Sequence, residues 1–432
     1  MTAIIAFLVL VITLIIGVPI PLTFFAASLT IIILGGYNYV ALLSYGFNSS
    51  SSIILIAIPL FILAGSVMEK SGISESLVNF VDLFVGRVKG GLNAVMVLSC
   101  AAFSAISGSG FATLSCVGSI MLPKMYKNGY PKGVSSALIS SASLLGVLFP
   151  PSLTKLMFAF VSGQSVLAAF VATVIPGIIL IILLSATSMW LVRKDPNIRV
   201  DKRMTRQEFA PELKKRTVNA TPALLAPIII LGGIYGGFLT PTEAAAVSVV
   251  YSVPIGWWVY KGLNTKTMKE CLISAGTTTG VVMIMLFSVM VLSQLFTREN
   301  VPQMILNAMT AVSDNPIIIV LMINLFLIAV GMFMDDISAI LLTTPIILPI
   351  AIAIGIHPIH YAAIMSVNLS MGCVMPPTAP FLYLGSRIGG APINEMLRPT
   401  MWLILFAWIP TLLLTTFIPE MSLIVPRVLG LI

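Results

Sequence analysis

Two Pro-Pro pairs have the residue types and spacing that most clearly predict a chemical role. Each belongs to the pattern G-x-x-x-P-P-[S/T], at residues 146–152 and 372–378. Proline lacks a backbone N–H and interrupts an α-helix, so carbonyls at 146–149 and 372–375 lose their partners within the helix. Free carbonyl oxygens suit Na⁺, a hard cation, and the following half-helix offers N–H groups to a carboxylate or sulfonate. The alternative is a simple kink in a packing helix.

Asp335 and Asp336 are adjacent acids inside an apolar run. A carboxylate at membrane depth is expensive to bury, so such acids are functional candidates by default. The alternative is a pair of helix caps near a water-filled mouth. Both residues are therefore candidates to contact substrate.

Lys155 lies one helical turn beyond the first Pro-Pro pair, again in an apolar run. Its ammonium could contact an anionic substrate, or its long side chain could extend to the membrane interface. Three serines, Ser107, Ser109 and Ser152, could donate hydrogen bonds to oxygen atoms of a solute.

Composition indicates the kind of protein that must position these groups. Hydrophobic residues make up 58% of the 432 residues and charged residues 9%, whereas soluble domains carry about 25% charged residues. The first charged residue is Glu69. The sequence therefore predicts an all-α polytopic membrane protein. Because Lys and Arg gather in short loops, the basic pI of about 9.4 indicates membrane orientation and not nucleic-acid binding.

Charge distribution predicts the topology. Residues 193–216 hold nine of the 23 Lys and Arg residues, so we expect this linker in the cytoplasm. Counting crossings back from it places the basic loop 124–132 in the cytoplasm and the N-terminus in the periplasm. Residues 37–53 and 355–361 contain no Lys or Arg, as expected of loops on the outer side.

Residues 91–123 do not fit a simple crossing, because the basic loops on both sides should be cytoplasmic. Two full crossings need about 40 apolar residues, and the segment is shorter. Its middle, residues 104–110, is rich in Ser and Gly. Backbone groups freed there cannot face lipid, but they can line a polar cavity. We therefore predict a re-entrant helical hairpin.

The two halves of the chain match at a constant offset of 226 residues, which relates Leu122-Pro123 to Leu348-Pro349 and one Pro-Pro pair to the other. The offset predicts inverted repeats, an architecture of secondary transporters. The predicted parts are residues 1–192 (hairpin about 91–123, broken helix about 134–160), the linker 193–216, and residues 217–432 (hairpin about 317–349, broken helix about 360–386).

Several segments resemble the large membrane subunit of tripartite ATP-independent periplasmic (TRAP) transporters. They are Ile58–Gly65, Met68–Ile73, Ser107–Ser109, Thr240–Ala246 and Thr344–Pro349. The resemblance covers nearly the whole chain. It implies an elevator-type, Na⁺-driven importer of a small organic acid, such as sialic acid, a C4-dicarboxylate or a sulfonate. It also implies a bacterial inner-membrane location, a soluble periplasmic binding protein that delivers the substrate, and a small four-helix membrane subunit.

The resemblance also implies two sodium sites. The first would use Ser107, Ser109, Gly146, Phe149 and Pro150. The second would use the hairpin from Gly331 to Asp336, with Gly372, Met375 and Pro376. Substrate would lie between Ser107, Ser152 and Asp335.

Two residues depart from the family pattern. A threonine usually precedes the second Pro-Pro pair, where this sequence has Met375. That change leaves only a backbone carbonyl for the cation. Lys155 is not associated with its place in the family either, which leaves room for a substrate other than the commonest dicarboxylates.

Three other functions compete with this hypothesis. The closest is a stand-alone anion–sodium symporter of the same superfamily, which needs no binding protein. A membrane-embedded enzyme would need a metal or nucleophile cluster at membrane depth, and the only histidines, His357 and His360, share one loop. A channel is the third alternative, but two symmetric cation-type sites indicate coupled transport rather than free conduction. We expect a transporter and not an enzyme.

Overall fold

The computed structural model describes residues 2–85, 88–200 and 206–432, and within these ranges every regular element is a helix. Seven of the described helices are long and apolar enough to cross a membrane, or eight when the bent pair Lys132–Leu148 and Leu153–Ser162 counts as one span. The predicted all-α polytopic class is therefore confirmed. Of the basic loop residues, Arg87, Lys202 and Arg203 lie outside the described residues.

The first repeat contains twelve α-helices and one short 3₁₀ helix. In chain order they are α1 (Thr2–Ile16), α2 (Ile20–Gly35), α3 (Tyr39–Ser50), η1 (Ile53–Ile56), α4 (Ala57–Lys70), α5 (Ile73–Val85), α6 (Gly91–Ser107), α7 (Gly110–Lys127), α8 (Lys132–Ala142), α9 (Leu145–Leu148), α10 (Leu153–Ser162), α11 (Val166–Val171) and α12 (Val174–Val192).

The second repeat contains eleven described α-helices and two π-helical turns. They are α13 (Arg206–Tyr235), α14 (Pro241–Pro254), η2 (Ile255–Val259), α15 (Thr265–Arg298), α16 (Val301–Val312), α17 (Pro316–Phe333), α18 (Asp336–Ala353), α19 (Pro358–Val374), α20 (Pro380–Gly389), α21 (Ile393–Leu403), η3 (Ile404–Trp408), α22 (Ile409–Phe417) and α23 (Glu420–Val428). Because α13 begins at Arg206, the end of the basic linker is helical.

The offset of 226 residues also relates the helices of the two repeats. Adding it to the bounds of α7 gives 336–353, the bounds of α18, and the run from α8 to α9 maps in the same way onto α19. The largest difference lies earlier in each repeat. There α3, η1 and α4 match one continuous helix, α15.

Each repeat contains a helical hairpin whose tip combines a helix end with a helix start. In the first, Gly108 ends α6 with a positive φ of 62°, and Ser109 caps α7 by accepting a hydrogen bond from the N–H of Ala112. In the second, Asp335 caps α18. Ser109 and Asp335 are related by the offset. Both are good N-cap residues, because each has a side-chain oxygen that can accept from free N–H groups of the first turn.

Each repeat also contains a helix broken at its Pro-Pro pair. The axes of the two halves in the first repeat differ by 43°. Glycines let the broken helices approach the hairpins closely. A Cβ atom on Gly146 would lie 2.7 Å from the carbonyl carbon of Ser109, and one on Gly372 would lie 2.8 Å from Gly331. The breaks therefore pack directly against the hairpins.

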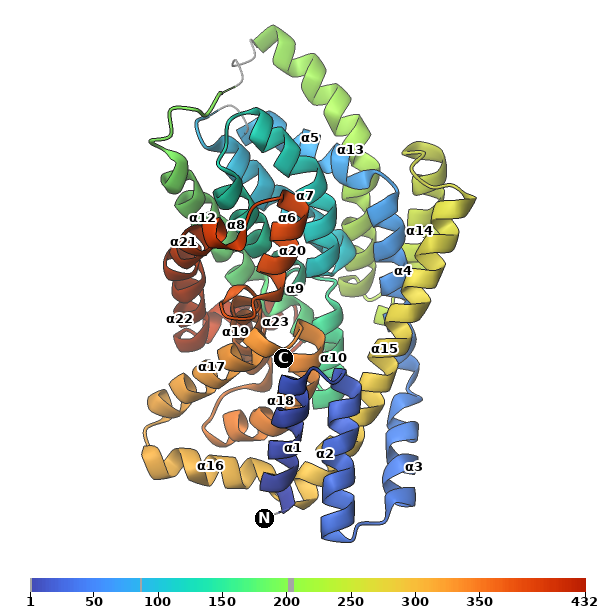
Figure 1. Cartoon of the computed structure of the whole chain (residues 1–432). Helices are drawn as coiled ribbons and strands as arrows, with labels where there is room; N and C mark the ends of the chain where they lie inside the picture. Colours follow the sequence, from blue (N-terminus) through green and yellow to red (C-terminus); the bar gives the residue numbers. More distant parts are fainter. Residues whose placement is uncertain (1, 86–87, 201–205) are drawn as a thin grey trace.

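Figure 1 shows the hairpin of α6 and α7 in one half of the molecule and the hairpin of α17 and α18 in the other. The long helix α15 runs beside both halves and contacts both α4 and α18. Each repeat therefore contributes one hairpin and one broken helix to the molecule.

Candidate functional site

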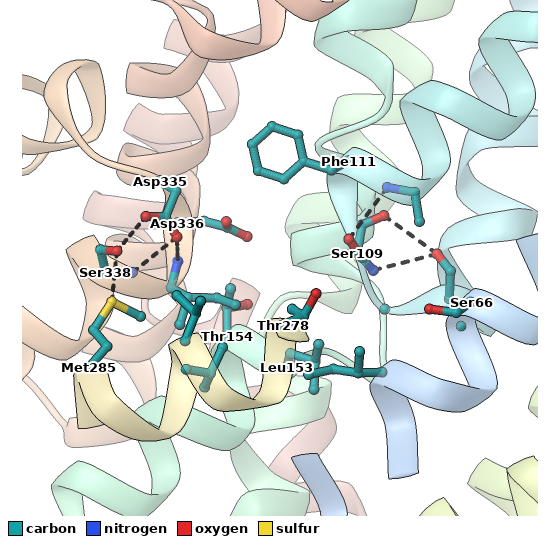
Figure 2. Close-up of a pocket in the computed structure, with 18 of the residues that line it drawn as sticks. Ser66, Ser109, Phe111, Leu153, Thr154, Thr278, Met285, Asp335, Asp336 and Ser338 are labelled. Atoms are coloured by element: carbon teal, nitrogen blue, oxygen red, sulfur yellow. Dashed lines mark hydrogen bonds between the residues drawn. The ribbon is translucent and has the colours of Figure 1, made fainter. Parts of the chain in front are cut away.

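A cavity of about 680 Å³ lies between the tips of the two hairpins. Figure 2 shows Ser109 and Phe111 on one side of it and Asp335, Asp336 and Ser338 on the other. Further walls come from α2, α4, α15 and the start of α10. The cavity therefore collects residues from both repeats.

The tip of the first hairpin is held by its own hydroxyl groups. Ser107 Oγ lies 3.4 Å from both the N–H and the carbonyl oxygen of Ser109, and Thr113 Oγ1 donates to the same carbonyl at 2.8 Å. A Cβ atom on Gly108 would lie 2.3 Å from the carbonyl oxygen of Pro151. The tip thus touches the first Pro-Pro pair, as expected for a site that combines the two.

The tip of the second hairpin presents two carboxylates. Asp335 Oδ2 accepts hydrogen bonds from the N–H groups of Ile337 and Ser338, each at 3.2 Å, and Ser338 Oγ donates to Asp335 Oδ1. Asp336 is buried and lines the cavity with Asp335. The alternative interpretation of Asp335 as a helix cap is therefore correct, and the same carboxylate also faces the cavity.

The carbonyls of the first Pro-Pro break are engaged by side chains. Lys155 Nζ donates to the carbonyl oxygens of Val147 and Leu148 at 2.7 and 2.6 Å. Ser152 Oγ donates to the Val147 carbonyl at 3.0 Å, and Thr173 Oγ1 donates to that of Leu148. These carbonyls were expected to be free for a cation. The prediction was wrong for these two because it considered only partners within the helix.

Lys155 has neither of the positions expected from the sequence. Its side chain is fully buried, so it does not extend to an interface. It is also absent from the residues that line the cavity, so it does not contact the space between the tips in this structure. The physical reason is that two nearby carbonyl oxygens satisfy its ammonium.

The second break is arranged differently. Its helix ends with the N–H of Met375 bonded to the carbonyl oxygen of Gly372 at 2.9 Å. Pro377 and Thr378, which follow, are exposed. The matching residues of the first break, Pro151 and Ser152, are buried.

The cavity brings together four of the predicted site residues, Ser107, Ser109, Asp335 and Asp336. The others lie outside its lining: Ser152, Lys155, Gly146, Phe149, Pro150, Gly331, Gly372, Met375 and Pro376. Several of these were expected to contribute only backbone oxygen. Ser152 is linked to the cavity through one neighbour. Its hydroxyl lies 2.7 Å from the hydroxyl of Thr154, which lines the cavity.

Sequence reasoning missed six polar residues of the cavity, namely Ser66, Glu69, Ser115, Thr154, Thr278 and Ser338. Thr154 and Ser338 could have been found, since each lies within three residues of a predicted site residue. Glu69 stands out in the sequence as the first charged residue and as part of the segment Met68–Ile73, but neither feature predicts that it lines the cavity. Ser66 and Thr278 lie on α4 and α15 and give no local signal, because their exposure to the cavity depends on how distant helices pack.

The charge of the lining is one-sided. Among the described residues that line the cavity, three are acids, Glu69, Asp335 and Asp336, and none is Lys, Arg or His. Hydroxyl and carboxylate oxygens can bind a hard cation, and free N–H groups at helix starts can bind an anion. An anion alone would be repelled by the carboxylates.

A family model for the tripartite ATP-independent periplasmic transporter, DctM component, matches residues 5–421. The C4-dicarboxylate TRAP transporter large permease protein DctM of Pseudomonas aeruginosa is 34% identical over 407 residues, with 94% of each chain covered. The sialic acid TRAP transporter large permease protein SiaM of Vibrio cholerae is 33% identical over 414 residues, with 95% of each covered.

Two further similarities extend the comparison. The isethionate TRAP transporter permease protein DctMQ of Oleidesulfovibrio alaskensis is 35% identical over 409 residues, and the match spans 94% of this chain but only 63% of that protein. Among solved structures, the YdaH transporter of Alcanivorax borkumensis, described as having an unusual topology, has a TM-score of 0.59 over 87% of each chain. Its sequence identity is 14%, so it supports the fold alone.

Proposed function

Because the chain belongs to the DctM family of tripartite ATP-independent periplasmic transporters, we propose that it imports a small organic anion together with Na⁺. The family supports a transporter. Sodium coupling and an elevator movement of the hairpins are our proposals for how the transporter works.

One observation supports the proposal that anion transport is coupled to Na⁺. The cavity between the hairpin tips has three carboxylates and, in the described lining, no basic side chain. An organic anion would have to bind beside Asp335 and Asp336, and like charges in a site of low dielectric repel strongly. A Na⁺ ion held by the same oxygens would remove this repulsion. Cation and anion would then bind best together, which is the requirement for coupled transport.

The solute is proposed by class. Family members are named for isethionate, C4-dicarboxylates and sialic acid, which share a negatively charged oxygen acid group on a small polar body. N–H groups at the start of α7 and the hydroxyls of Ser109 and Thr154 are suitable donors for such a group. We propose a carboxylate or sulfonate of this size.

The proposed setting follows the family. The chain would lie in the inner membrane with its N-terminus toward the periplasm and the first hairpin open to the cytoplasm. A soluble periplasmic binding protein would deliver the anion, and a small membrane subunit would complete the transporter. The relatives' names, which distinguish large permease proteins, support the second subunit.

Uptake of labelled solutes tests this proposal. The chain is reconstituted in vesicles with its small subunit, and purified binding proteins are added with isethionate, a C4-dicarboxylate or sialic acid. We expect accumulation of one class of anion, only when its binding protein is present. Equal uptake without the binding protein would favour the stand-alone symporter instead, and no uptake of any anion would contradict the proposed substrate class.

A further inference from the structure

The buried ammonium of Lys155 lies where a small cation would be expected at the first break. Its two acceptors, the carbonyls of Val147 and Leu148, are among those that the Pro-Pro pair leaves without a helical partner. The distances of 2.7 and 2.6 Å are those of close hydrogen bonds. No carboxylate pairs with Lys155 in the described part of the chain, so carbonyl dipoles alone offset its charge.

Two hydroxyl groups share the carbonyls that hold the ammonium. Ser152 and Thr173 donate to the same two carbonyls, and each hydroxyl oxygen keeps lone pairs that could face a cation. Two carbonyl oxygens, with two hydroxyls bonded to them, would therefore remain at the break if the ammonium were absent. Such a set of oxygens suits a hard monovalent ion.

The second repeat has no such ammonium. The offset of 226 places Phe381 at the position of Lys155. The ring of Phe381 is buried and stacks on Phe111, with the ring centroids 4.3 Å apart.

The orphaned carbonyls of the second break also remain available. Those of Cys373 and Val374, which correspond to Val147 and Leu148, accept no side-chain hydrogen bond from the described residues. Exposed residues follow them, whereas the first break is buried. The two breaks therefore differ in two ways. The first has a buried ammonium and buried neighbours, and the second has no ammonium and exposed neighbours.

We propose that the ammonium of Lys155 is a tethered cation that occupies the first Pro-Pro break, so that Na⁺ exchanges at the second break. The inference rests on the Na⁺ coupling proposed above and specifies where it occurs. It replaces the first of the two sodium sites implied by the family resemblance. Two cations of like charge within one turn of the same helix end would repel, because a helical turn spans only about 5.4 Å.

Counting bound Na⁺ on the purified full-length chain tests the proposal. Lys155→Ala removes the ammonium and leaves space between the oxygens, whereas the control Lys155→Met removes the charge but fills the space. We expect Lys155→Ala to bind one more radioactive Na⁺ per chain than the wild type, and Lys155→Met to bind the same number as the wild type. The unfolding midpoint of Lys155→Ala should also rise more steeply with Na⁺ concentration, as expected for one additional bound ligand.

A merely structural role for Lys155 predicts something else. Both variants would then lose stability without any change in the number of bound ions, and this result would overturn the proposal. Failure of the proposed function is a separate outcome. Na⁺-independent uptake by the wild type would remove coupling, yet the difference in Na⁺ count between Lys155→Ala and Lys155→Met would still be measurable.

A second variant tests the proposal even if Lys155→Ala does not fold. Phe381→Lys places an ammonium at the matching position of the second break, and Phe381→Met is its control for the lost ring. We expect Phe381→Lys to bind one fewer Na⁺ than Phe381→Met and to lose stimulation of uptake by Na⁺. Equal Na⁺ counts in the two variants would contradict the proposal.

Discussion

Replacing Asp335 with asparagine is expected to reduce Na⁺-dependent uptake at least about tenfold while leaving the second hairpin folded. A carboxylate about 4 Å from a cation contributes roughly 4 kcal/mol at an effective dielectric constant of about 20, and about 1.4 kcal/mol corresponds to tenfold in affinity. Water in the cavity reduces this value. Asparagine is as good an N-cap as aspartate, so it can still accept from the first turn of α18.

Two variants separate charge from capping. Asp335→Ser introduces the residue that the first repeat has at the matching position, Ser109. It should cap α18 and should lose uptake as asparagine does. Asp314→Asn makes the same substitution at an exposed position between α16 and α17 and should transport normally. Uptake by Asp335→Asn at the wild-type rate would remove the carboxylate from the proposed site.

Replacing Gly108 with alanine is expected to abolish most uptake and to destabilise the protein by about 2–5 kcal/mol. The residue has a positive φ of 62°, which costs a non-glycine residue about 1–2 kcal/mol. The added Cβ would also lie 2.3 Å from the carbonyl oxygen of Pro151, and overpacking of this kind costs about 1–3 kcal/mol. The tip of the first hairpin would have to move away from the Pro-Pro break.

Gly163→Ala is the matched control for Gly108→Ala. Gly163 also ends a helix, with a φ of 67°, but a Cβ atom there would have no neighbour within 4 Å. This variant should lose only the stability that a positive φ costs a non-glycine residue. We therefore expect a small drop in melting temperature and normal uptake. If both variants lost uptake equally, contact between the hairpin tip and the break would not explain the effect.

The repeat register made much of the fold predictable. Pro-Pro pairs, hairpin caps and helix bounds all recur at an offset of 226 residues. Similar residues at matching positions form the same helices in both halves. Ser109 and Asp335 could be placed at the hairpin tips in this way, since Gly, Ser and Asp favour helix ends. The family assignment followed from several such segments taken together and is confirmed by the match over residues 5–421.

The position of Lys155 could not be predicted in the same way. An ammonium in an apolar run indicates a buried partner, but the partners are backbone carbonyls, which every residue has. Only the bend at Pro150-Pro151 returns Lys155 toward the residues before the break. The contribution of Thr278 likewise depends on the packing of α15 beside the hairpins. No local sequence motif marks the site residues that come from neighbouring helices, so their contribution cannot be predicted from the sequence.

Accumulation of the anion against its own gradient tests Na⁺ coupling most directly. Vesicles that contain the chain, its small subunit and the binding protein are loaded with the labelled anion at the external concentration, and an inward Na⁺ gradient is applied with no other ion gradient. We predict that the internal anion rises above the external concentration and falls back when the Na⁺ gradient collapses. An equal rise with K⁺ in place of Na⁺, or no rise with either ion in vesicles that take up the anion, would contradict it.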